Sequence, residues 1–76
     1  MKKKTRQNIK LKFGQRVKQL RNAQKMTQSK LALKCKLSRE EICRIEQGKK
    51  NSFLLTCTDL SEGFGITLKE LFNFKY

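Results

Sequence analysis

The residues that could do chemistry in this 76-residue sequence are its cations and its three cysteines. Lys and Arg number 19 against 6 Asp and Glu, which gives a formal net charge of +13, and there is no His. The sequence therefore lacks the usual general base at neutral pH and the commonest metal ligand. Cys35, Cys43 and Cys57 show no two-residue zinc-knuckle gap, and Cys35 and Cys57 are expected in the core. We accordingly expect no enzyme, no metal site and no cofactor.

The cations are unevenly distributed along the chain. Residues 1–25 carry a net charge of +10, residues 26–50 carry +4, and residues 51–76 carry −1. This gradient predicts one polyanion-binding face and a second face with another role, and the polyanion is either a nucleic acid or an acidic membrane surface. No apolar run approaches the roughly 18–20 residues of a membrane span, and none follows the basic start as in a secretory leader. A cytoplasmic protein with reduced thiols is expected.

Five short helices are predicted to position these side chains, in one all-α domain over residues 9–73. Their ranges are about 9–24, 28–35, 39–47, 53–64 and 68–73, between a flexible basic arm (1–8) and a C-terminal tail (74–76). The end of the chain, residues 72–76, could pair as a strand. Thr27, Ser38, Ser52 and Thr67 are the expected N-caps. Glu41 and Glu70 complete capping boxes with Ser38 and Thr67, and Gly48 and Gly65 are the expected C-terminal stops.

The second and third predicted helices are separated only by residues 36–38, which is the spacing of a helix-turn-helix motif. The motif spans residues 28–47. Ala32 is small enough for the two helices to cross closely, and Leu37, Ile42 and Ile45 are branched residues that can fill the wedge between them. These four residues are therefore predicted to hold the motif together.

The residues themselves resemble a known family. Met26-Thr-Gln-Ser-Lys-Leu-Ala and Leu37-Ser-Arg-Glu-Glu-Ile-Cys-Arg-Ile-Glu-Gln-Gly-Lys-Lys-Asn are similar to the Cro/C1-type helix-turn-helix (XRE) family, and the similarity runs without a gap from about Phe13 to Phe72. The resemblance implies a five-helix lambda-repressor-like DNA-binding domain. It also implies that double-stranded DNA is bound by a homodimer, with the second motif helix in the major groove.

The resemblance assigns roles residue by residue. Arg39 or Arg44 would read a guanine, and Glu40 would accept a hydrogen bond from cytosine. Arg21 and Glu46 match a partly buried salt bridge of the family. Lys36 stands where the family usually has Gly, so a left-handed turn there should cost about 1 kcal/mol. The full set of implied DNA contacts is Gln28, Ser29, Arg39, Glu40, Cys43, Arg44, Lys49, Lys50 and Asn51.

Apolar residues crowd the end of the chain, and exposed apolar clusters mark interfaces. The expected dimer interface comprises Leu68, Leu71, Phe72, Phe74 and Tyr76, with Phe53 and Leu55 as possible additions. The alternative is that this tail folds over the core.

The predicted function is a sequence-specific transcriptional regulator that binds a pseudo-palindromic operator, resembling phage repressors or restriction-modification controllers. One alternative is an antitoxin-type DNA-binding module whose main partner is a toxin protein. Another is membrane-surface binding by the basic first helix.

Overall fold

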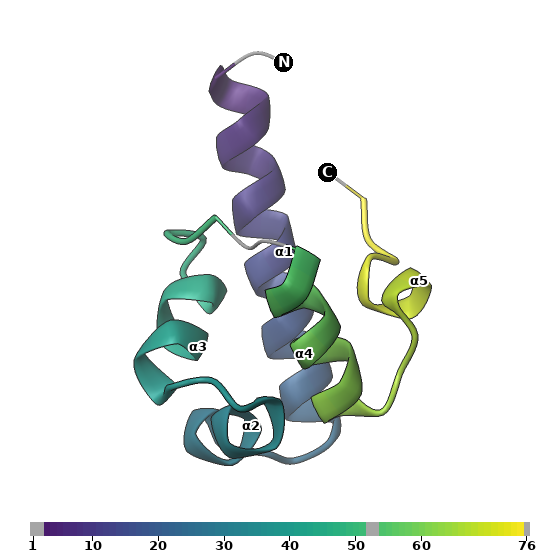
Figure 1. Ribbon diagram of the computed structural model, residues 1–76. Helices are drawn as coiled ribbons and strands as arrows, with labels where there is room; N and C mark the ends of the chain where they lie inside the picture. The colour runs from purple at the N-terminus through teal and green to yellow at the C-terminus, as the bar shows by residue number, and fades with distance from the viewer. Residues whose placement is uncertain (1–2, 52–53, 76) are drawn as a thin grey trace.

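The computed structural model describes the backbone of residues 3–51 and 54–75, and the side chains of residues 7–51 and 54–75. These residues form α1 (Lys3–Ala23), α2 (Gln28–Cys35), α3 (Arg39–Glu46), α4 (Leu54–Phe64) and α5 (Leu68–Leu71). Within these ranges there is no strand, so the expectation of an all-α fold is confirmed and the described part of the tail is not a β-strand. In Figure 1, α1 runs through the molecule with α3 on one side and α5 on the other.

The first helix is longer than predicted. It begins at Lys3 rather than at Ile9, so residues 3–8 are helical, and the expectation of an arm there is corrected. The reason is local, because residues 3–8 contain no Gly or Pro and several good helix formers. The helix ends at Ala23, and the chain turns through Lys25 in a left-handed conformation (φ 56°), which the sequence did not predict.

The motif turns are built as expected. The Oγ1 of Thr27 accepts a hydrogen bond from the backbone N–H of Lys30 at 3.1 Å. Ser38 and Glu41 form the predicted capping box, with distances of 3.0 and 3.2 Å. Lys36 takes the left-handed conformation (φ 58°, ψ 36°) expected at the turn. The two motif helices therefore start and stop where their capping residues require.

The core lies between α1 and the other four helices. The predicted motif residues Ala32, Ile42 and Ile45 are buried, and Leu37 packs against them as a partly buried side chain. Cys35 and Cys57 are also buried, as expected, and burial raises the pKa of the Cys35 thiol to about 11. Both thiols behave as small apolar side chains.

Two glycines allow close helix crossings that the sequence did not identify. A Cβ on Gly14 would overlap the backbone carbonyl oxygens of Ile45 and Glu46, so α1 and α3 can approach only without a side chain there. A Cβ on Gly63 would overlap the Sγ of Cys35, which explains a glycine inside α4 despite its helix cost of up to about 1 kcal/mol.

The C-terminal segment folds back onto α1. Thr67 and Glu70 form the predicted capping box of α5, and Gly65 has φ +72°. Rings of Phe72 and Phe74 lie 5.9 and 6.2 Å from the ring of Phe13, measured between centroids. Much of this tail therefore covers the core. The predicted cap Ser52 and the predicted helix start Phe53 lie outside the described residues.

Candidate nucleic-acid interface

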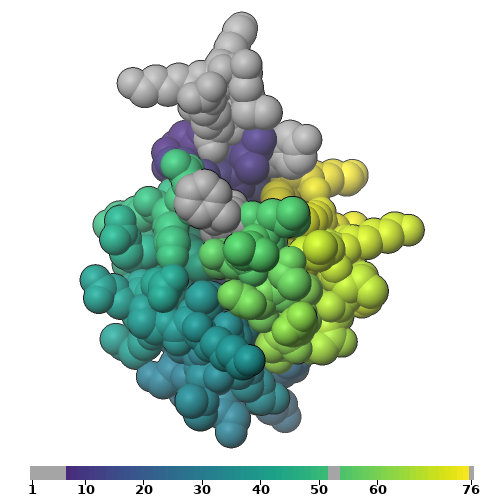
Figure 2. Space-filling model, viewed as in Figure 1, coloured from purple at the N-terminus to yellow at the C-terminus, as the bar shows by residue number. Residues whose placement is uncertain are grey.

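The third helix, α3, has two clearly different faces. Ile42 and Ile45 are fully buried, whereas Arg39, Glu40 and Arg44 are exposed and Cys43 is half-buried. Positions i, i+1, i+4 and i+5 share one side of an α-helix, so these four predicted contact residues lie together. In Figure 2 the side chains of α3 form one edge of the molecule. The structure thus presents two arginines, a carboxylate and a thiol on one accessible helix face.

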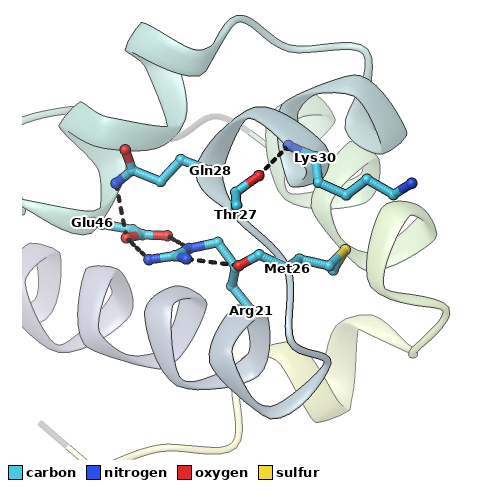
Figure 3. A network of polar contacts seen from close by, with 6 residues as sticks. All are labelled: Arg21, Met26, Thr27, Gln28, Lys30 and Glu46. Atoms are coloured by element: carbon cyan, nitrogen blue, oxygen red, sulfur yellow. Dashed lines mark hydrogen bonds and ion pairs between the residues drawn. The ribbon is translucent and has the colours of Figure 1, made fainter.

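This face is held by an ion pair beneath it. Arg21 Nε and Nη2 donate to the two carboxylate oxygens of Glu46 at 2.7 and 3.0 Å, and Nη1 donates to the Met26 carbonyl at 2.8 Å. Only 12% and 4% of the two side chains are exposed. The hydrogen bond that Arg21 donates to Glu46 raises the pKa of Arg21, against the opposing effect of burial. The predicted salt bridge between α1 and α3 is confirmed (Figure 3).

Gln28 extends this network into α2. Its Nε2 donates to Glu46 Oε1 at 3.1 Å, and the side chain is half-buried (Figure 3). Gln28 is the first residue of α2, followed by the exposed Ser29. Because the first backbone N–H groups of a helix and its dipole attract anions, this end of α2 is suited to a phosphate. The structure therefore gives Gln28 a positioning role that the sequence did not predict.

The loop after α3 contains two lysines in different settings: Lys49 is exposed, and Lys50 is paired with Glu41. Gly48 has φ +72°, and the Lys49 N–H donates to the Arg44 carbonyl at 3.0 Å. Lys49 and Asn51 are exposed. Lys50 Nζ instead donates to Glu41 Oε2 at 2.7 Å, and this hydrogen bond lowers the pKa of Glu41. Lys50 was predicted to meet the DNA backbone, but here it fastens the loop to the first turn of α3.

Sequence reasoning missed three parts of this arrangement: the Glu41–Lys50 pair, the link from Gln28 to Glu46, and the close crossing at Gly14. A glycine inside an otherwise helical pattern is the one signal that could have identified the crossing. The two pairings depend on the relative orientation of α2, α3 and the loop, which spacing along the chain does not provide.

Two other kinds of site are absent from the described part of the chain. Its His, Cys, Asp and Glu residues form no group of three or more that could hold a metal ion. Among the described helices, none combines the length and the apolar character needed to cross a membrane.

A buried helix crossing, a three-residue turn and a second helix that exposes two arginines define a helix-turn-helix protein. Residues 17–71 match the family model described as "Helix-turn-helix". This match covers more than half of the sequence, so the chain belongs to the helix-turn-helix family, of the Cro/C1 type.

Relatives within the family are similar over nearly their whole length. The chain is 41% identical to control protein C.BamHI of Bacillus amyloliquefaciens, over 88% of this chain and 84% of that protein. It is 39% identical to control protein C.MunI of Mycoplasma sp., over 87% and 90%.

Solved structures agree with this placement. The restriction-modification controller protein C.AhdI of Aeromonas hydrophila aligns with a TM-score of 0.79 at 35% identity, over 82% of this chain and 94% of that one. ComR of Streptococcus suis aligns with a TM-score of 0.72 at 30% identity, over 84% of this chain but only 21% of that one. The fold is therefore that of a controller protein.

Proposed function

We propose that this chain is a DNA-binding transcriptional regulator of the restriction-modification controller class. The observation that carries the proposal is the exposed face of α3, which bears Arg39 and Arg44 on a helix that the Arg21–Glu46 ion pair ties to α1. A helix whose orientation is fixed by contacts with the rest of the domain can present the same side chains to base edges in every complex. Similarity to control proteins over most of both chains supports the same conclusion.

Each exposed residue of this face has a proposed role at the DNA. Arg39 and Arg44 donate to guanine O6 and N7, Glu40 accepts from cytosine N4, and Cys43 lies against a thymine methyl group. Phosphates are held by the start of α2, at Gln28 and Ser29, and by the loop residues Lys49 and Asn51. Lys50 contributes mainly by holding that loop against α3 through Glu41.

We propose that the regulator acts as a homodimer on a pseudo-palindromic operator whose half-sites lie about 34 Å apart. Leu71 is fully buried within the single chain, so its expected interface role is corrected to a core role. Exposed apolar side chains remain at Phe72 and at the start of α4, where Leu54 and Leu55 are 69% and 79% exposed. The proposed interface comprises Leu54, Leu55, Leu68, Phe72 and Phe74; Tyr76 lies outside the described residues.

The two alternatives are less well supported. Membrane-surface binding by α1 requires a free apolar face, but Phe13 and Val17 of that helix are buried in the core. The antitoxin alternative receives no support from the relatives, which carry the names of control proteins. A regulator in the cytoplasm, without enzymatic activity, fits the site best.

The proposal is tested by selecting bound duplexes from a random pool at about 150 mM salt, where phosphate-driven binding weakens. An operator-reading dimer enriches one inverted repeat. If one site without an inverted repeat were enriched, the homodimer claim would be contradicted but base recognition would stand. If no sequence were enriched, the claim that α3 recognises bases would be contradicted.

A further inference from the structure

A basic hollow lies between α1 and the C-terminal tail. Its volume is about 330 Å³, at the lower end of the range for small-molecule sites. The described residues that line it are Lys12, Gln15, Arg16, Gln19, Phe74 and Lys75, of which three are cations and none is acidic. The DNA-binding face described above uses none of these residues.

Arg16 is the central residue of this hollow. Its Nη1 donates to Gln19 Oε1 at 2.9 Å, and its Nη2 donates to the Glu70 carbonyl at 2.7 Å. Its Nε is buried and has no hydrogen-bond partner within the described part of the chain. Buried polar groups in folded proteins nearly always have a partner, so an unpartnered guanidinium N–H indicates a missing acceptor. A guanidinium donates best to an oxyanion.

The carboxylate of Glu70, on the tail side, is engaged elsewhere. Glu70 Oε1 accepts from the backbone and the hydroxyl group of Thr67, at 3.3 and 3.2 Å, in the capping box of α5. Among the described residues that line the hollow, no acid balances the positive charge of Lys12, Arg16 and Lys75. A small anion in the hollow would neutralise this charge.

The hollow faces away from the DNA-binding side. Gly14 marks the side of α1 that contacts α3, and at about 100° per residue Arg16 lies about 200° from it, on the opposite side of the helix. Figure 2 likewise shows α3 and the C-terminal segment at opposite edges of the molecule. An anion in the hollow would therefore be separate from the phosphates of an operator bound on α3.

We propose that this hollow is a binding site for a small phosphate-class oxyanion, which bridges α1 and the C-terminal tail. Arg16 and Lys12 hold the anion from α1, and Lys75 holds it from the tail. Binding fastens the tail that carries Phe72 and Phe74. If the proposed dimer is correct, occupancy of the hollow also strengthens self-association, but anion binding itself does not depend on that function.

The test is a titration of the full chain with inorganic phosphate, with sodium chloride adjusted to keep ionic strength constant, followed by backbone amide NMR shifts. We expect saturable shifts confined to residues 12–19 and 70–75. Arg16→Gln and Lys75→Gln should each weaken phosphate binding about tenfold, the value of one charge-assisted hydrogen bond. Lys75 is exposed at the chain end, so its variant tests the site even if Arg16→Gln loosens the fold.

The matched control is Lys18→Gln, which removes one charge from an exposed position of the same helix outside the hollow. It should alter phosphate affinity by less than about twofold, because salt screens the attraction between an exposed charge outside the hollow and the bound anion. Equal losses in all three variants, or shifts spread over α3, would show general anion binding by a cationic surface and overturn the proposal. Absence of saturable shifts would overturn it as well. Sedimentation with and without phosphate tests the dimer consequence separately.

Discussion

The two elements that pack against opposite sides of α1 are held in different ways. On one side α3 has polar contacts in addition to its buried Ile42 and Ile45: Arg21 and Gln28 bind Glu46, and Lys50 binds Glu41. On the other side α5 and the tail are held by apolar contacts, with Leu71 in the core and Phe72 and Phe74 against Phe13. Hydrogen bonds and ion pairs have directions, whereas apolar burial does not. Directional contacts fix the orientation of α3, as the proposed base contacts require, whereas apolar contacts are sufficient for α5 and the tail to cover the core.

The largest expected effect lies on the apolar side. Leu71→Ala removes a fully buried side chain and should cost about 3 kcal/mol of unfolding free energy. Phe72→Ala, at the next residue, is 44% exposed and should cost only about 1 kcal/mol, through its ring contact with Phe13. Urea unfolding measures both. Similar costs would contradict the division of this segment into a core residue and a surface residue.

The same two variants also sharpen the proposed interface. Sedimentation under conditions in which both variants are fully folded should show weaker self-association for Phe72→Ala. Leu71→Ala should retain the wild-type association constant once its lower stability is allowed for, since its side chain does not reach the surface.

A smaller effect is expected on the polar side, at Glu46. Glu46→Gln leaves the buried Arg21 charge without its carboxylate and should cost about 2–3 kcal/mol, below the full cost of an unpaired buried ion because the amide oxygen still accepts one hydrogen bond. Glu62→Gln, the same change at an exposed position, should be nearly neutral. A neutral Glu46→Gln in thermal or urea unfolding would show that the ion pair does not brace α3.

The smallest effect belongs to the exposed pair Glu41–Lys50. Lys50→Ala should cost at most about 0.5 kcal/mol at pH 7, because exposed ion pairs contribute little. Lys50 lowers the pKa of Glu41 in the folded state, so the pair stabilises the fold above the ordinary Glu value of 4.5 and this contribution is lost as the pH falls through the lowered pKa. The difference between wild type and Lys50→Ala should therefore shrink toward pH 3.

Lys49→Ala is the control for this measurement, because Lys49 is the neighbouring exposed lysine. Its stability difference from wild type should not follow the titration of Glu41. A Lys50→Ala difference that stays constant with pH would contradict the role of the pair in fastening the loop.

The comparison also explains what the sequence could predict. Both capping boxes, the stop at Gly48 and the helix-turn-helix motif were predictable, because each depends on residues a few positions apart, whereas the left-handed turn at Lys36 was expected from the family resemblance. The Arg21–Glu46 pair was expected only through family resemblance. The exposed face of α3 followed from the same resemblance and agrees with its observed burial pattern.

Errors arose where an assignment depended on distant partners. Leu71 and Phe72 are adjacent apolar residues in a short terminal segment, and only the position of Phe13 and the rest of the core separates the buried residue from the exposed one. Lys49 and Lys50 are likewise adjacent and identical, and the hydrogen bond from Lys50 to Glu41 was not expected, while the predicted DNA contacts of both lysines stay predictions. The extra turns of α1 were missed because residues 3–8 have helix propensity but no apolar pattern, and they were therefore interpreted as a flexible arm.

The central claim, that α3 reads bases while the loop only grips the backbone, is tested most directly at Arg44 and Lys49. The measurement is the dissociation constant of each alanine variant for the selected site and for a panel in which each base pair is changed in turn. Arg44→Ala should lose about 1–3 kcal/mol and its preference at one base pair, whereas Lys49→Ala should weaken binding to every duplex about equally. Uniform weakening by both variants would contradict the claim.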